Sequence, residues 1–197
     1  MSQSSSNSSL LRYLAIAVGV SLLLTGVLAY SLERRANILR SGTEVVLKTV
    51  PVDPRDLLRG DYVVLSYDVS AIPDTSIVGE RPKEPAWVTM SVRLKPGADG
   101  YWAVAEASFG GLAPQEGSTI LRTKRFRFDH SASGGGYNLR VDYGIERFYV
   151  PEGAGMALEE ARNMEKMAVV ARVGASGSAQ IRRLLVDGQP VYEEPLY

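Results

Sequence analysis

The chain has 197 residues, of which 45% are hydrophobic and 22% are charged, and its 22 basic and 22 acidic side chains balance. This composition excludes a disordered chain and fits one ordinary domain. The absence of cysteine excludes disulfides, cysteine nucleophiles, thiolate zinc sites and iron–sulfur clusters. The single histidine, His130, cannot build a multi-histidine metal site.

An apolar segment follows a polar N-terminal tail, residues 1–12. Residues 13–32 carry no charge, and at about 1.5 Å of rise per residue they match the roughly 30 Å hydrocarbon core of a bilayer. Tyr13 and Tyr30 lie near the two ends, where aromatic side chains favour the membrane interface. We therefore predict one membrane-spanning helix that contacts the lipid bilayer through residues 13–32.

Two alternatives remain for this segment. Val27 and Ala29 form a small-residue pair at which a signal peptide could be cleaved, although Arg12 is the only charge before the segment. The basic residues of the juxtamembrane linker, residues 33–42, favour a cytoplasmic domain by the positive-inside rule. A short polar tail before one apolar segment is typical of a signal anchor, and long domains translocate largely regardless of charge. We favour the extracytoplasmic (periplasmic) side for the large domain.

Residues 43–197 predict a domain of short strands. Runs of β-branched or alternating residues separated by turn signals occur at 44–50, 61–69, 86–95, 101–109 and 137–143. The alternation in 61–69 places Val63, Leu65, Tyr67 and Val69 on one face. The alternation in 86–95 places Met90 and Val92 inward and Trp87 and Arg93 outward. The turn at 96–100 predicts a hairpin.

The remaining elements complete the predicted fold. In 119–129, Phe126 and Phe128 share strand parity with Arg122 and Lys124, which predicts a bulge or break near Arg125. Residues 155–165 predict the one short helix, with Ala157, Ala161 and Met164 on one stripe. Residues 166–173 and 180–188 predict a closing hairpin around a Gly/Ser-rich turn. The fold class is mainly β or α+β, an antiparallel sheet or small barrel-like domain of about seven or eight strands.

One segment resembles a known family. Residues 51–67, PVDPRDLLRGDYVVLSY, contain Gly60, Asp61, Tyr62, Leu65 and Tyr67 in the pattern G-D-Y-x-x-L-x-Y. This pattern is similar to the motif of the GDYXXLXY family of bacterial membrane-anchored proteins. Segments 143–153 and 184–197 also look like the family.

The resemblance implies a membrane anchor and one extracytoplasmic domain, and it implies no particular activity. Members are often encoded beside polytopic membrane proteins, which hints at a complex. The motif itself has two interpretations. It is a structural corner with tyrosine hydroxyls tied to buried backbone, or Asp61 and Tyr62 face a partner or ligand. In both, Leu65 and Tyr67 point to the core and Tyr62 to the other face.

A second constellation lies in YGIERFYVPEG, residues 143–153. On a strand, Glu146 and Arg147 point to opposite faces and do not pair with each other. Either could pair with the PRDLLR turn, and we predict an Arg55–Glu146 ion pair, the alternative being a solvated charge on each face.

The sequence lacks the catalytic groups that the enzymatic interpretations require. Leu57, Gly60, Asp61 and Val63 resemble a stretch of type I signal peptidases, but the nucleophilic serine would fall near Val52, where none is present. A Ser/His/Asp triad would have to use His130, which lies beside the glycine-rich segment 131–136. A flexible loop does not hold a catalytic histidine in one orientation. No spacing of carboxylates singles out a pair, so we predict no metal site and no cofactor.

The sequence thus predicts a membrane-anchored, non-catalytic domain that binds a polytopic membrane protein. Residues 41–197 hold 18 basic and 21 acidic side chains, so no nucleic-acid partner is expected. The alternative is an envelope-associated hydrolase or ligand-binding domain that uses carboxylates near the motif, on a distant signal-peptidase-like β fold.

Overall fold

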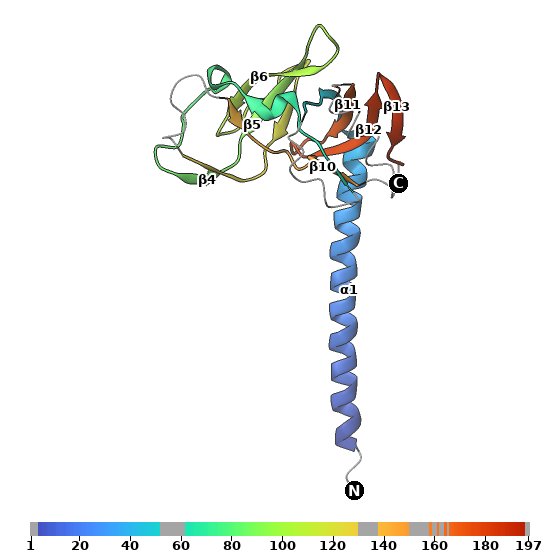
Figure 1. Ribbon diagram of the computed structural model, residues 1–197. Helices are drawn as coiled ribbons and strands as arrows, with labels where there is room; N and C mark the ends of the chain where they lie inside the picture. The colour runs from blue at the N-terminus through green and yellow to red at the C-terminus, as the bar shows by residue number, and fades with distance from the viewer. Residues whose placement is uncertain are drawn as a thin grey trace. The chain divides into compact units, whose positions relative to one another are not determined.

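The protein consists of one long N-terminal helix followed by a β-rich unit (Figure 1). The computed structural model describes residues 4–51, 62–129, 138–149, 158, 161, 164 and 166–195, and for 4–10 and Tyr62 it describes the backbone alone. The chain divides into two compact units, Met1–Asn37 and Ile38–Tyr197.

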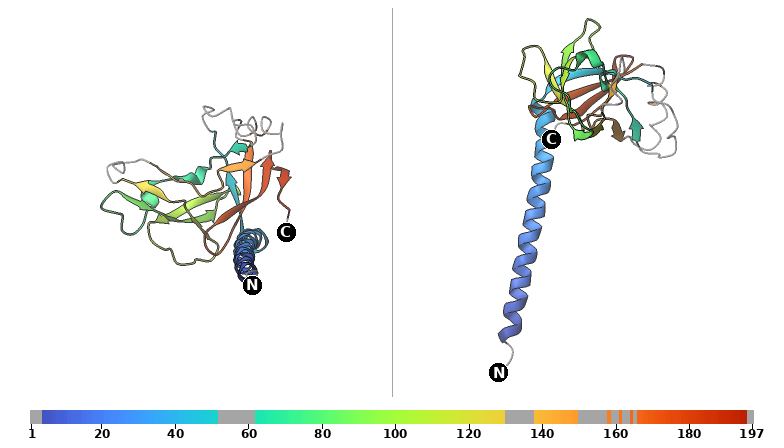
Figure 2. Two further views of the ribbon diagram at one scale, coloured as in Figure 1. Left: turned by 90° about the horizontal axis from the view of Figure 1, so that it is seen from below. Right: turned by 90° about the vertical axis from the view of Figure 1, so that its left-hand side faces the viewer.

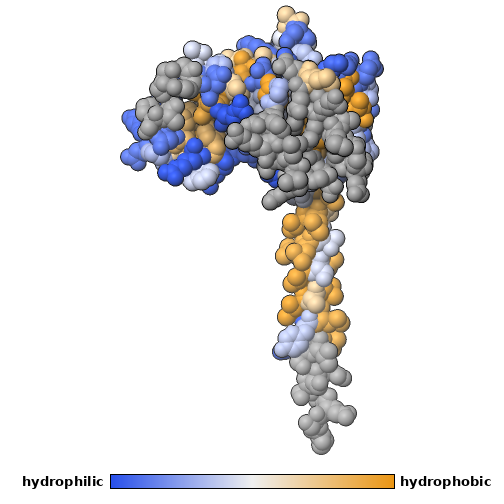
Figure 3. Space-filling view, viewed as in Figure 1, coloured by the Kyte–Doolittle hydropathy of each residue, from blue (hydrophilic) through white to orange (hydrophobic). Residues whose placement is uncertain are grey.

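Helix α1 spans Ser4–Ser41, and its part from Leu11 to Ser41 is long and apolar enough to cross a membrane. A signal sequence has the same property. The large apolar side chains from Leu11 to Leu32 are all at least half exposed. Most of the coloured part of the helix is apolar on the face shown in Figure 3. A helix that is apolar all round needs an apolar environment, so lipid is the surrounding that suits these residues.

The last turn of α1, Ile38–Ser41, belongs to the β-rich unit. Ile38 and Leu39 are buried, and the Gly42 N–H donates to the Ile38 carbonyl at 2.9 Å. A Cβ on Gly42 would lie 2.5 Å from the Ile38 carbonyl oxygen and 3.0 Å from that of Val173, so this position has no room for a side chain. The predicted linker 33–42 is therefore helical through Ser41, and strand β1 begins two residues later.

The largest sheet contains the first strand and the last three strands of the chain. Its order is β1 (Thr43–Lys48), β11 (Met167–Val173), β12 (Ala179–Val186) and β13 (Gln189–Glu193), all antiparallel. The predicted hairpin around the Gly/Ser-rich turn is confirmed as β11–β12. Strand β13 adds a further hairpin that the sequence analysis missed.

A three-stranded antiparallel sheet lies beside the first one (Figures 1 and 2), with β1 next to β6 and β11 next to β7. Its order is β6 (Trp102–Ser108), β5 (Ser91–Pro96) and β7 (Thr119–Arg122). The β5–β6 pairing confirms the hairpin predicted across the PGADG turn.

Three antiparallel pairs of short strands complete the described fold. They are β2 (Tyr62–Val64) with β10 (Arg147–Tyr149), β3 (Ala71–Ile72) with β9 (Leu139–Arg140), and β4 (Ala86–Val88) with β8 (Phe126–Phe128). Two 3-10 turns, η1 (Asp68–Ser70) and η2 (Asp74–Ser76), interrupt the chain between them. The mainly β, antiparallel fold class is confirmed, and the described strands form open sheets without a closed barrel.

One hydrophobic core unites these small sheets. Its fully buried members come from widely separated segments, and the largest include Tyr67, Leu47, Leu65, Ile72, Met90 and Leu121. The four alternate residues predicted to share one face of 61–69, namely Val63, Leu65, Tyr67 and Val69, are all buried. The ladder of this strand nevertheless ends at Val64, and η1 begins at Asp68.

The predicted alternation along 86–95 is wrong at Arg93. The chain breaks between β4 and β5, and β5 is buried on both faces from Ser91 to Leu94. The Arg93 side chain is 4% exposed, because its guanidinium is bonded to neighbouring strands and loops. An arginine with enough partners can lie inside, and alternation alone does not reveal those partners.

The break predicted near Arg125 is confirmed. Strand β7 ends at Arg122 and β8 begins at Phe126, so the parity changes between them. Phe128 is consequently buried and contacts Phe109 edge to face, at 4.7 Å between ring centroids. Of the two incompatible sets, Arg122 ends β7 and Lys124 lies in the break, whereas Phe126 and Phe128 lie in β8.

The predicted short helix 155–165 falls mostly outside the described residues. Leu158 and Ala161 are helical, and Ala161 is buried. Met164 lies in a turn and is 53% exposed, so the predicted stripe does not extend to it.

Replacement of Gly42 by alanine tests the connection between helix and sheet. We expect Gly42→Ala to lower the free energy of unfolding by about 1–3 kcal/mol, because the new methyl group meets backbone atoms that cannot move aside. Thermal unfolding of the full-length protein in mild detergent, followed by near-ultraviolet circular dichroism, measures this loss. Gly111→Ala is the control, since a Cβ there meets nothing within 4 Å. Equal melting of both variants would contradict the expectation.

Candidate functional site

The second half of the motif, Leu65–Tyr67, is hydrogen-bonded along both of its edges. On one side the Leu65 N–H donates to the Glu146 carbonyl at 2.8 Å. On the other side the Val50 N–H donates to the Ser66 carbonyl at 2.9 Å, and Thr49 forms an antiparallel bridge with Tyr67. The motif therefore connects the end of β1 to the segment that leads into β10.

Tyr67 is buried at the centre of this connection. Its side chain is 1% exposed, and its hydroxyl donates to the Ile145 carbonyl at 2.5 Å. Burial, with a smaller contribution from the negative charge of Glu146, raises the pKa of the Tyr67 hydroxyl well above its usual value. Tyr67 thus remains a neutral hydrogen-bond donor at physiological pH.

Tyr143 forms the reciprocal contact between the same two segments. Its hydroxyl donates to the Val69 carbonyl at 2.7 Å, and burial followed by the Glu146 charge raises its pKa above the ordinary range. The two tyrosines therefore cross between the same two segments, each bonded to the backbone of the other segment. This arrangement fits the interpretation of the motif as a structural corner.

Glu146 holds the turn that precedes β10. Its carboxylate accepts hydrogen bonds from the N–H groups of Tyr143 and Gly144, the latter at 2.7 Å. Gly144 has a φ of +88°, a conformation that favours glycine. The carboxylate is thereby engaged in local backbone contacts, which orient it to shape the turn.

The remaining predicted site residues are placed as follows. Gly60, Asp61 and Arg55 lie outside the described residues, and so does the predicted Arg55–Glu146 ion pair. The backbone of Tyr62 pairs in register with Tyr149, and that of Val64 pairs with Arg147. Arg147 and Tyr149 are exposed, and Phe148 between them is buried against Tyr192 at 4.8 Å between ring centroids.

Sequence reasoning missed a pocket of about 360 Å³ beside the end of α1. It is lined by residues of β1, β5, β7, the 114–118 loop and the β11–β12 turn, including Ser41, Thr43, Arg93, Ser118 and Gly174. The Arg93 guanidinium donates to Glu106 at 2.5 Å, to Ser118 Oγ at 3.0 Å and to the Ala113 carbonyl at 2.6 Å. Among the described lining residues Arg93 is the one cation, and each of its three guanidinium nitrogens donates a hydrogen bond, so Arg93 fastens the loop to β5.

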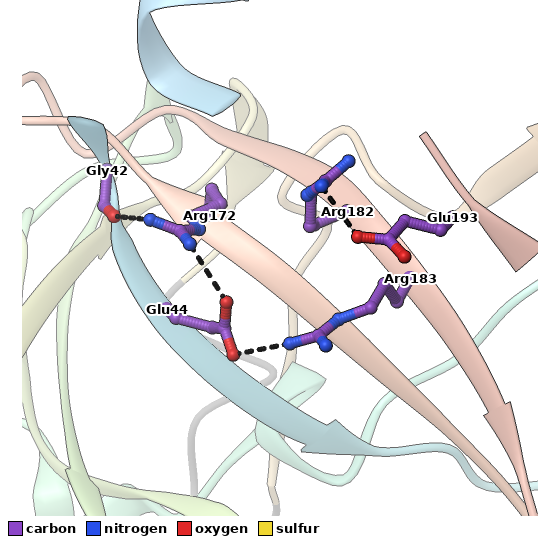
Figure 4. A network of polar contacts seen from close by, with 6 residues as sticks. All are labelled: Gly42, Glu44, Arg172, Arg182, Arg183 and Glu193. Atoms are coloured by element: carbon purple, nitrogen blue, oxygen red, sulfur yellow. Dashed lines mark hydrogen bonds and ion pairs between the residues drawn. The ribbon is translucent and has the colours of Figure 1, made fainter. Parts of the chain in front are cut away.

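A charged network also covers part of the four-stranded sheet (Figure 4). Glu44 pairs with Arg172 at 3.0 Å and with Arg183 at 2.7 Å, and Arg172 donates to the Gly42 carbonyl at 3.0 Å. Arg182 pairs with Glu193 at 2.6 Å. These contacts tie the residue after α1 to three strands. The partly exposed pairs each contribute little stability, because water screens them.

Within the described ranges, no group of three or more His, Asp or Glu side chains is arranged to hold a metal ion. Around the described part of the motif, the Tyr67 and Tyr143 hydroxyls and the Glu146 carboxylate are bonded to backbone atoms. The geometry there supports a structural role, and the carboxylates Asp53, Asp56 and Asp61 lie outside the described residues.

The sequence model of the family described as GDYXXLXY protein matches residues 24–184. The chain belongs to the GDYXXLXY family. No curated protein and no solved structure matches it significantly. The matched range begins inside α1 and ends in β12, so it includes the C-terminal part of α1, with strands β1 and β11 and most of β12.

The Tyr67 hydroxyl offers a direct test of the structural corner. We expect Tyr67→Phe to lower the free energy of unfolding at neutral pH by about 1–3 kcal/mol, since it leaves the Ile145 carbonyl buried without this donor. Guanidinium unfolding of the full-length protein in detergent measures the change. Tyr101→Phe, in the β5–β6 turn, is the control and should unfold like the unmodified protein.

The same variant has a signature at alkaline pH. Because the folded protein raises the pKa of Tyr67 and Tyr143, their contribution is complete below about pH 10, where unfolded tyrosine still holds its proton. Above that pH the unfolded chain loses protons that the folded chain keeps, so stability falls. We expect Tyr67→Phe to reduce this slope by up to about 1.4 kcal/mol per pH unit. An unchanged slope between pH 9 and 11.5 would contradict the assignment.

Proposed function

We propose that the protein is a single-pass membrane protein whose β-rich unit lies on the extracytoplasmic side. There it binds an integral membrane partner as an accessory subunit and catalyses no reaction of its own. The observation that carries the proposal is the inclusion of Ile38–Ser41, the end of the apolar helix, in the β-rich unit.

The attachment of the helix supports a role at the membrane surface. Ser41 lies nine residues after Leu32 in α1, about 14 Å by helical rise. A domain that meets soluble targets away from the membrane gains from a long flexible spacer. A domain joined through Gly42, with backbone packed around it, is better suited to a neighbour in the same membrane.

The exposed side chains of β10 support a partner surface beside the motif. Tyr149 is 71% exposed and lies in register with Tyr62, the motif tyrosine on β2. Tyrosine and arginine are enriched among the residues that dominate binding energy at protein interfaces. Strand β10 presents one of each, Arg147 and Tyr149, on the same face.

The absence of a dedicated reactive group around the described motif residues supports the non-catalytic part. Tyr67, Tyr143 and Glu146 all bond to nearby backbone, and the raised tyrosine pKa values keep both hydroxyls neutral. The envelope hydrolase remains the alternative, and no described contact favours it.

Single cysteines test the topology, because the natural chain contains none. We expect Ser176→Cys, in the exposed β11–β12 turn, to react with a membrane-impermeant maleimide on intact spheroplasts, and Ser6→Cys in the N-terminal tail to react only after lysis. Mass spectrometry of the labelled Ser6→Cys protein at full length would show that the helix is retained as an anchor. Labelling of Ser176→Cys only after lysis would place the domain in the cytoplasm and contradict the proposal.

Co-purification tests the accessory role. We expect the tagged full-length protein to leave native membranes in mild detergent with one stoichiometric polytopic protein. Tyr149→Ala should reduce its recovery at least about tenfold, a loss of about 1.4 kcal/mol. Val191→Ala removes exposed apolar surface from β13 and is the matched control. Melting of all variants separates lost binding from lost fold, and purification of the unmodified protein alone would contradict the partner.

A further inference from the structure

The β4–β8 ribbon carries one polar, basic face and one apolar face. Its strands pair Ala86 with Phe128, Trp87 with Arg127 and Val88 with Phe126. Phe128 is buried and packs on Phe109, whereas Trp87 is 61% exposed and Arg127 lies exposed opposite it. The ribbon therefore turns a tryptophan and an arginine outward from the core.

Arg125 adds a second cation to this outer face. Its guanidinium carbon lies 6.0 Å from the centre of the Trp87 ring, within the range of a cation–π contact. Neither Arg125 nor Arg127 forms an ion pair within the described part of the chain. Both guanidinium groups retain their capacity to bind an anion.

The charge of the ribbon opposes that of the domain that carries it. Segments 83–89 and 122–129 contain five basic and two acidic side chains, whereas residues 41–197 as a whole have three more acidic than basic ones. The break at 123–125 creates this face, because it sends Phe126 and Phe128 toward the core and leaves Arg125 and Arg127 outside. A local excess of positive charge on an acidic domain marks a surface for an anionic occupant.

We propose that the outer face of this ribbon, formed by Trp87, Arg125 and Arg127, binds the anionic head groups of the bilayer in which the chain is anchored. Arginine forms bidentate hydrogen bonds with phosphate, and the amphipathic indole of tryptophan favours the membrane interface. The anchor keeps that surface continuously near the domain, so a weak contact is sufficient. The inference uses the membrane anchor of the proposed function and is independent of the protein partner.

Fluorescence of the full-length protein in lipid nanodiscs tests the contact. The chain contains two tryptophans, so the difference between the unmodified protein and Trp87→Phe isolates the Trp87 signal. Lipids brominated near the head group quench an indole that lies at the interface. We expect quenching of Trp87 in nanodiscs of phosphatidylcholine mixed with phosphatidylglycerol, and little in phosphatidylcholine alone.

Charge removal provides the decisive comparison. The Arg125→Gln/Arg127→Gln double variant should weaken the contact about 30-fold, the equivalent of about 1 kcal/mol for each arginine near an anionic surface. Lys95→Gln/Arg140→Gln removes two exposed charges outside the ribbon and should leave the quenching unchanged. Raised salt should weaken the contact in the unmodified protein.

Three results would overturn the proposal. They are the absence of quenching in anionic nanodiscs, quenching of equal strength in both lipid compositions, and quenching that survives the double arginine variant. Protection of Trp87 from acrylamide by soluble polyglutamate, without any response to anionic lipid, would instead assign the face to an acidic macromolecule. Because these nanodiscs contain no second protein, failure here leaves the co-purification result unaffected.

Discussion

The described fold depends on the backbone hydrogen bonds that the Leu65–Tyr67 segment forms along both of its edges. Its backbone bonds to the end of β1 on one side and to the residues before β10 on the other. Several small sheets do not by themselves make a stable domain, because a two-stranded ribbon is marginal in water. The motif segment connects the small sheets to one another. Its Leu65 and Tyr67 side chains lie in the common core, and its backbone joins the β1 and β10 segments.

The tyrosines extend this connection into the interior. A buried carbonyl that loses its partner costs more than an ordinary hydrogen bond gains, so the Tyr67–Ile145 and Tyr143–Val69 contacts penalise any separation of the two segments. Phenylalanine would fill the same volume without satisfying either carbonyl. This requirement explains why tyrosine at position 67 suits the motif. The Tyr67 hydroxyl is neutral and buried, whereas a catalytic tyrosine would need access to a substrate.

The sequence predicts the parts of this fold that depend on local pattern. Alternation identifies Val63, Leu65, Tyr67 and Val69 as one buried face, and the parity conflict around Arg125 locates the break between β7 and β8. Strand β13 could also have been predicted, because the Asp187-Gly188 pair before it is a strong hairpin signal. In the structure both residues of this two-residue turn have positive φ. The burial of Arg93 could not be predicted, because it depends on Glu106, Ser118 and Ala113, which lie near Arg93 only in the folded chain. The same limit applies to Glu146, whose carboxylate turns back to its own loop.

The burial of the motif side chains limits which residues can form a binding surface. Leu65 and Tyr67 are buried in the core of the β-rich unit, and a side chain engaged in that way cannot also contact a partner or a lipid. In the proposed function and the proposed lipid contact, recognition therefore uses side chains exposed outside the core, such as Tyr149 on β10 and Trp87 on β4. These two lie on separate ribbons, so contact with a protein and contact with a membrane do not compete for the same residues. The buried part of the motif therefore acts through the fold of this chain, and the proposed contacts use side chains that the fold leaves exposed.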